Sequence, residues 1–194
     1  MPSARRLYAV ASLMAVVIAA YTATNRLHWR EPAFLPVSAL DRAAPFVPGA
    51  MWVYASHFVF LPGCLLLLRG EGVFARVRAA VLSGVLLSNA VFLFWPTTIA
   101  RVAHPSFLFD FIALMDEPVN CFPSQHVGLA LIAAWGLRRD GFPGASLFLA
   151  WAGAISVSTV LVRQHYAADV AGGAALALLS WKLSGLVAPA GSRG

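Results

Sequence analysis

Between its apolar stretches the chain reads Asn120-Cys-Phe-Pro-Ser-Gln-His126, and further on it reads Arg163-Gln-His-Tyr-Ala-Ala-Asp169. These two segments put two histidines, a carboxylate and a serine into a sequence that is otherwise mostly hydrocarbon. Polar side chains are costly beside a lipid bilayer, so a group of them in such a chain is a functional-site hypothesis by default. Whether the two segments meet depends on the arrangement of the apolar stretches around them.

The composition is that of an integral membrane protein. Of the 194 residues, 60% are hydrophobic and only 11% are charged, whereas soluble domains carry about 25% charged residues. The net charge is +6, but the basic residues lie in short clusters between apolar runs. We therefore interpret the charge as a sign of membrane topology and expect no nucleic-acid partner. The two cysteines, Cys64 and Cys121, indicate no disulfide framework.

The apolar stretches predict an all-α, polytopic membrane protein. A helix that spans a bilayer needs about 20 largely apolar residues. Six stretches are candidates, at residues 7–23, 49–68, 79–100, 126–137, 142–162 and 166–187. We expect six transmembrane helices in one bundle and a single domain over residues 1–194. Its catalytic core would lie at about 79–185, and its outer loops at about 25–48 and 97–123.

The basic residues predict which ends of the helices lie inside. With the N-terminus inside, nine of the 14 Lys and Arg residues fall on the inner side, which follows the positive-inside rule. These nine are Arg5, Arg6, Arg69, Arg76, Arg78, Arg138, Arg139, Lys182 and Arg193. The first stretch has features of a signal peptide, but its length and the lack of a clear cleavage site favour an uncleaved anchor. The compact loops favour a bacterial inner membrane with the site facing the periplasm.

This topology places both histidines of the polar segments at the outer face. His126 opens the fourth helix from outside, and His165 precedes the sixth. His165 and Asp169 are four residues apart, which puts them on one face of a helix start. The aspartate can accept from one imidazole nitrogen and leave the other free to attack a substrate. The alternative is a structural hydrogen bond that fixes the helix end.

Pro123-Ser124-Gln125-His126 has the form of a helix N-terminus, because serine is a strong N-cap residue and an apolar helix follows. The free N–H groups of such an end attract an anion, and the Ser124 hydroxyl adds a donor. A protonated His126 can donate to a leaving oxygen. Most sequences of this kind are ordinary helix starts. The alternative is therefore that these residues begin a helix and have no role in catalysis.

Arg101 and Arg163 are candidates to bind phosphate, since a guanidinium matches phosphate oxygens in a bidentate way. The alternative is that they reach lipid headgroups at the interface. A metal site built from the histidines with Asp110, Asp116 or Glu117 is a competing interpretation, but no tight ligand spacing supports it. We expect no metal and no cofactor. His57 is interpreted as a hydrogen-bonded core residue without a role.

Together these motifs resemble the type 2 phosphatidic acid phosphatase superfamily, whose signatures are K-x6-R-P, P-S-G-H and S-R-x5-H-x3-D. The second signature corresponds to residues 123–126, with Gln125 in place of glycine. The third runs from Ser158 to Asp169, with Thr159 in place of arginine. The first is nearly absent. Arg101 stands at the position of its arginine, but Phe94 occupies the lysine position and Val102 the proline position.

The departures resemble the branch of inositol phosphorylceramide synthases and sphingomyelin-synthase-like transferases, as does the segment at residues 41–48. The resemblance implies that His165 forms a phosphohistidine, that Asp169 orients it and that His126 protonates the departing alcohol. Ser124, Gln125, Arg101 and Arg163 would bind the phosphate, and the family needs no metal.

The expected activity is therefore that of a lipid phosphatase or phosphotransferase, with a phospholipid or polyprenyl phosphate as substrate. Two alternatives remain. One is transfer of inositol phosphate or another headgroup to a lipid alcohol. The other is a non-catalytic membrane scaffold that retains the fold.

Overall fold

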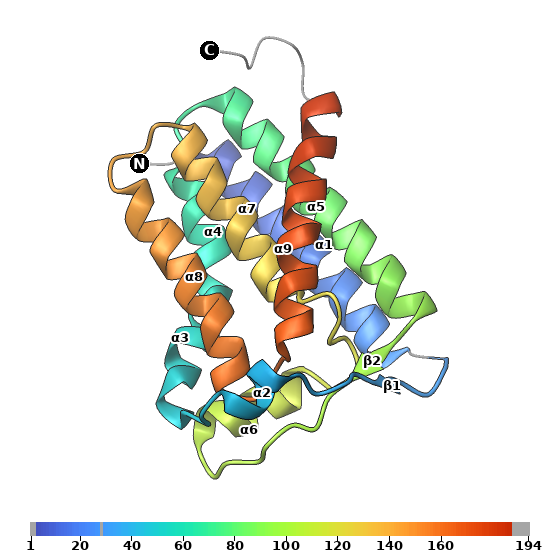
Figure 1. The fold of residues 1–194 in the computed structure, drawn as a ribbon. Helices are drawn as coiled ribbons and strands as arrows, with labels where there is room; N and C mark the ends of the chain where they lie inside the picture. Colours follow the sequence, from blue (N-terminus) through green and yellow to red (C-terminus); the bar gives the residue numbers. More distant parts are fainter. Residues whose placement is uncertain (1–2, 28, 188–194) are drawn as a thin grey trace.

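A computed structural model describes residues 3–27 and 29–187, and Arg193 of the predicted inner set lies outside these ranges. The described chain is mostly helical (Figure 1). The longer helices are α1 (Ala4–Arg26), α4 (His57–Leu67), α5 (Glu71–Phe94), α7 (Gln125–Arg139), α8 (Ala145–Leu161) and α9 (Ala167–Val187). The shorter elements are β1 (Ala33–Phe34), α2 (Ala39–Ala43), a 3-10 turn (Pro48–Ala50), α3 (Met51–Ala55), β2 (Thr97–Thr98) and α6 (Phe107–Met115).

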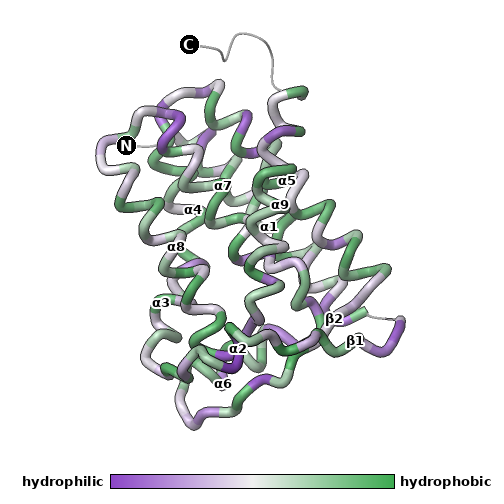
Figure 2. Tube along the Cα trace, viewed as in Figure 1, coloured by the Kyte–Doolittle hydropathy of each residue, from purple (hydrophilic) through white to green (hydrophobic). Residues whose placement is uncertain are grey.

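Several of the helices carry the hydrophobic character that a membrane requires. Among the described residues, three helical segments are long and apolar enough to cross a bilayer. One further apolar helix is shorter. The three are Ala4–Arg26, Pro48–Leu67 and Glu71–Phe94, and the shorter one is Ala145–Leu161. Hydrophobic residues run along the helices, and hydrophilic ones gather mostly at the two ends of the molecule (Figure 2). The prediction of six spans in one bundle goes beyond this and stays a prediction.

Helix α7 lies at the centre of the packing, against α4, α5, α8 and α9. Ten of its 15 residues are buried. Small residues allow this, because they let neighbouring backbones approach closely. At Gly128, for example, an added Cβ would lie 3.2 Å from the carbonyl oxygen of Gly173 in α9. The helix that begins with the first polar segment is therefore enclosed by its neighbours.

The third predicted stretch, at residues 79–100, has the wrong boundaries. Helix α5 begins at Glu71 and ends at Phe94. Arg76, predicted in the inner loop, therefore lies within the helix, and its guanidinium packs over the ring of Trp181 in α9 at 4.6 Å. The helix ends early because Pro96 disfavours a helical conformation at Trp95. Arg101, which we expected to close this helix, lies in the irregular segment after β2.

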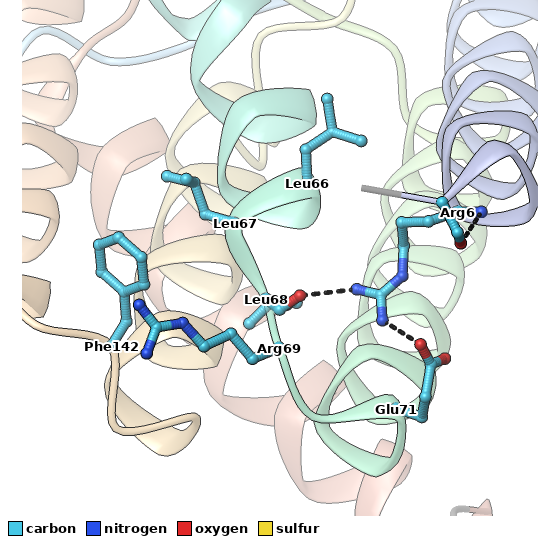
Figure 3. Close-up of a pocket in the computed structure, with 8 residues that line it drawn as sticks. Arg6, Leu66, Leu67, Leu68, Arg69, Glu71 and Phe142 are labelled. Carbon is cyan, nitrogen blue, oxygen red and sulfur yellow. Dashed lines mark hydrogen bonds and ion pairs between the residues drawn. The ribbon is translucent and has the colours of Figure 1, made fainter. Parts of the chain in front are cut away.

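The end of the bundle with the predicted inner loops holds a cavity of about 470 Å³ between α1, α4, α5 and Phe142. Figure 3 shows the Arg6 guanidinium donating to the Leu68 carbonyl oxygen at 2.9 Å and pairing with the carboxylate of Glu71. The ring of Phe74 lies 3.8 Å from the same guanidinium. Arg6 is thus partnered within the protein, in the first turn of α1, and α9 begins at the opposite end of the bundle (Figure 1).

The connections at the other end are tied together by a small parallel pairing of β1 with β2, in which Ala33 pairs with Thr97. Thr97 also forms an isolated parallel β-bridge with Asn120. Its hydroxyl accepts from the Phe122 N–H at 2.8 Å, and its carbonyl accepts from the Cys121 N–H at 3.2 Å. These bonds hold the first polar segment in front of α7.

Close contact between α7 and α9 predicts the effect of Gly173→Ala. The added Cβ would lie 2.5 Å from the carbonyl oxygen of Ser124 and 2.9 Å from Cβ of Val127. The helices must move apart, which typically costs about 1–3 kcal/mol. We expect a lower thermal unfolding temperature in detergent. Gly153→Ala is the control, because nothing lies within 4 Å of its added Cβ. Equal unfolding temperatures for the two variants would contradict this packing.

Candidate active site

His165 and Asp169 form a buried pair at the start of α9. The Nδ1 atom of His165 lies 3.3 Å from Oδ2 of Asp169, which also accepts from the Tyr166 N–H at 2.8 Å. His165 is 2% exposed and Asp169 is 0% exposed. Because the aspartate holds Nδ1, the Nε2 atom is the nitrogen of His165 that can react.

His126 lies directly opposite His165. Its Nδ1 atom is 3.2 Å from Nε2 of His165, and its Nε2 atom is 3.3 Å from the hydroxyl of Tyr54. A row of polar groups therefore runs from Asp169 through His165 and His126 to Tyr54. The two segments that are distant in the sequence meet in this row.

The backbone explains why the two histidines meet. The Ser124 N–H donates to the Asp169 carbonyl at 3.0 Å, which joins the N-terminus of α7 to the first turn of α9. The Ser124 hydroxyl accepts from the Val127 N–H at 3.4 Å and caps α7. Ser124 thus occupies the predicted N-cap position of α7.

Two residues of this cluster were not predicted. Tyr54 in α3 had no assigned role, and His57 was interpreted as a core residue. The Nδ1 atom of His57 is 3.0 Å from the Tyr54 carbonyl oxygen. The His57 ring also packs edge-on against His126, with ring centroids 4.1 Å apart. The available signal was a histidine and a tyrosine three residues apart inside an apolar stretch, where polar groups usually have a function.

Arg101 is held beside the cluster by Asp116. Its guanidinium donates to the carboxylate at 2.8 Å and to the carbonyl oxygen of the same residue at 2.7 Å. Burial lowers the pKa of Arg101, but the charge of Asp116 outweighs it, so the pKa is raised and the cation is permanent. Tyr21 and Asn25 of α1 bond the same carboxylate. Within the described residues, Nε of Arg101 has no hydrogen-bond partner.

Arg163 and Gln125 have different surroundings from those predicted. The Arg163 guanidinium donates to the carbonyl oxygens of Asp41 and Ala44, at 2.6 and 2.7 Å. It therefore ties the α2 segment to the turn before α9. The Gln125 side-chain oxygen accepts from the Ser88 hydroxyl at 2.7 Å, which fixes α7 to α5. In the described structure, both side chains therefore bond protein groups of neighbouring segments.

Cys121 does not compete with His165 as a nucleophile. It is completely buried, and burial raises the pKa of its thiol to about 12. At neutral pH the side chain is a thiol, which is far less nucleophilic than a thiolate. Among the residues that the structure describes, no group of three or more His, Cys, Asp or Glu is arranged to hold a metal ion.

This arrangement defines a helical protein of apolar spans with two facing histidines and an aspartate at one end. The family model of the PAP2 superfamily matches residues 26–183, and the chain belongs to this superfamily. Membership indicates phosphatase or phosphotransferase activity on phosphate esters, and it agrees with a membrane protein. Comparisons with curated proteins and with solved structures gave no significant match.

The contacts of Asp41 predict how stability depends on pH. Its carboxylate accepts from the Ala167 N–H at 2.7 Å, at the start of α9, and from the Ser38 hydroxyl and N–H. Burial raises the pKa of Asp41, but these bonds and the charge of Arg163 outweigh it and lower the pKa below its ordinary 3.8. The ionised form therefore stabilises the fold above this pH.

We expect wild type to unfold at a higher temperature than Asp41→Asn at pH 6. The difference should shrink as the pH falls toward 3, because protonation removes the contribution of a carboxylate whose pKa is lower in the folded state. Thermal unfolding in detergent across this range measures it. A difference that does not change with pH would contradict the assignment.

Proposed function

We propose that the protein is a membrane enzyme that cleaves or transfers a phosphate-containing lipid headgroup at the outer membrane face. Six helices would span the membrane, and the reaction would proceed through a phosphohistidine without metal or cofactor. The observation that carries the proposal is the row of Asp169, His165 and His126, with Nδ1 and Nε2 of the two histidines 3.2 Å apart.

In the first step, Nε2 of His165 attacks phosphorus and the bond from phosphorus to the alcohol oxygen breaks. Asp169 holds the proton on Nδ1 and stabilises the charge that forms on the ring. The negative charge of the bound phosphate would favour the imidazolium form of His126, which would give its Nδ1 proton to the departing alcohol oxygen. In the second step, His126 takes a proton from water or an alcohol while that oxygen attacks phosphorus and His165 is released.

The phosphate oxygens need donors around this row. Arg101 suits this role, because Asp116 orients its guanidinium and leaves Nε unpartnered within the described residues. The N-terminus of α7 at Ser124 adds the partial positive charge of a helix end. We assign Arg163 an indirect role, through its hold on Asp41 beside Ala167. Gln125 would likewise position α7 through Ser88 rather than contact phosphate.

Burial of the nucleophile favours transfer as the second candidate outcome. His165 is only 2% exposed, and a site that excludes water protects a covalent intermediate from hydrolysis. The resemblance to inositol phosphorylceramide and sphingomyelin-like synthases points the same way. A lipid alcohol would then replace water as the group that accepts the phosphoryl or headgroup.

The apolar surface near the site supports a lipid substrate. Helix α6 packs Phe109 and Ile112 against Met51 and Tyr54 of α3. Its other side exposes Phe107 and other large apolar residues. A helix with such a face fits the plane of a membrane interface. Together with the basic residues predicted on the inner side, this face supports our proposal that this end of the bundle lies at the outer surface, which in a bacterial inner membrane is the periplasmic side.

The experiment that tests the function uses purified protein in detergent with labelled phosphatidic acid and labelled phosphatidylinositol. Free phosphate and lipid products are both followed, with and without a chelator and with and without an added lipid alcohol. Free phosphate indicates a phosphatase, and headgroup transfer without free phosphate indicates a transferase. No turnover of any phosphate ester, with the protein folded, would favour the scaffold alternative.

His165→Ala should abolish turnover and the acid-labile phosphoenzyme, because it removes the nucleophile. Asp169→Asn should lower kcat by about 10²–10⁴-fold, since the imidazole loses its orienting charge. The control is His104→Ala, whose ring packs against Phe46 and Phe109 outside the row. Rapid quench with labelled substrate measures the intermediate. Normal turnover by His165→Ala would refute the mechanism.

Arg101→Lys should lower kcat/KM by about tenfold or more. Lysine keeps the charge but cannot bond Asp116 and phosphate together as a guanidinium does. Arg42→Lys is the control, because its guanidinium donates to the Val37 carbonyl on the exposed surface. Steady-state kinetics with phosphatidic acid compare the two variants. Equal kcat/KM values would remove Arg101 from the phosphate site.

A further inference from the structure

The hydroxyl of Tyr54 lies at the end of the polar row, 3.3 Å from Nε2 of His126. Tyr54 is 1% exposed. In the described part of the chain, this is the hydrogen bond that its hydroxyl makes. A buried tyrosine hydroxyl usually has a hydrogen-bond partner, and here that partner is a proposed catalytic group.

The bond decides which nitrogen of His126 is available to a substrate. When one imidazole nitrogen is held by a hydrogen bond, the other is left for proton transfer. With Nε2 held by Tyr54, the Nδ1 atom faces Nε2 of His165. When His165 attacks a phosphate, the leaving oxygen would take its proton from Nδ1 of His126.

The tyrosine hydroxyl suits both charge states of His126, because it can accept or donate a hydrogen bond. It accepts from Nε2–H when His126 is the imidazolium. It accepts the same bond after Nδ1 has given its proton to the alcohol oxygen. Nδ1 then has a free lone pair, to which water or an acceptor alcohol returns a proton in the second step. No net proton enters or leaves Tyr54.

The surroundings of Tyr54 hold its ring in place. It belongs to a buried cluster with Met51, Phe109, Ile112 and Val162. The His57 ring makes two contacts. Its Nδ1 atom bonds the Tyr54 carbonyl oxygen, and the ring packs edge-on against His126. The rings of Tyr54 and His126 are 5.1 Å apart. The hydroxyl is therefore presented to Nε2 by a packed scaffold.

We infer that Tyr54 is a positioning residue of the reaction, which holds Nε2 of His126 so that Nδ1 exchanges the proton with the leaving and entering oxygens. The inference rests on the proposed function and adds a residue from α3, outside the sequence motifs.

The test compares two substrates with different leaving groups. Phosphatidic acid releases an alkoxide and needs an acid, whereas p-nitrophenyl phosphate releases a stable phenolate and needs little help. Tyr54→Phe removes one oxygen and keeps the ring. We expect kcat/KM to fall about 10–100-fold for phosphatidic acid and by less than about threefold for p-nitrophenyl phosphate. His126→Ala should show the same pattern.

A double variant sharpens the test. If Tyr54 acts through His126, then Tyr54→Phe should cost nothing further in the His126→Ala background. Ser184→Ala is the matched control, because it removes a buried hydroxyl that bonds the Trp181 carbonyl within α9. It should leave both substrates unaffected.

Equal losses on both substrates, additive losses in the double variant or a Tyr54→Phe protein that does not fold would overturn the inference, because the hydroxyl would then be structural. Unchanged kinetics of Tyr54→Phe in an enzyme that His126→Ala inactivates would also overturn it and leave the proposed function intact. A wild type without turnover of either ester would instead refute the proposed function.

Discussion

The hydrogen bond from the Ser124 N–H to the Asp169 carbonyl is the contact on which the site depends. It joins the first residues of α7 to the first turn of α9, and the absence of a side chain at Gly173 leaves room for the approach. A hydrogen bond between backbone groups is strong where water is excluded. It brings together the helix ends that carry His126 and His165, whose Nδ1 and Nε2 atoms lie 3.2 Å apart.

The connections at this end of the bundle act as a frame for that contact. Asp41 accepts from the Ala167 N–H, and Arg163 donates to carbonyl oxygens of the same α2 segment. Thr97 holds the residues that precede Ser124. Buried polar groups are tolerated in an apolar protein when they are paired, and these bonds pair the carboxylate of Asp41, the guanidinium of Arg163 and the hydroxyl of Thr97. The cost of placing polar residues beside hydrocarbon is thereby offset at the one place where chemistry is proposed.

The arrangement also bears on how a site with few charged groups would bind the phosphate of the proposed reaction. One cation, Arg101, is fixed by a carboxylate that is itself bonded by Tyr21 and Asn25. The remaining charge stabilisation would come from a helix end and from an imidazole that changes its protonation state. Low dielectric surroundings strengthen each of these interactions relative to water.

The sequence by itself determined the class of protein, the approximate position of the apolar stretches and the relations between residues close in the sequence. The spacing of His165 and Asp169 and the N-cap at Ser124 are of this kind, because residues close in sequence meet through local geometry. Only the tertiary structure decided that Tyr54 and His57 join the cluster, that Arg163 contacts the α2 segment, and that Arg101 lies beyond the end of α5. These contacts depend on how helices rotate and pack against one another, and the spacing of residues along a chain contains no measure of that rotation.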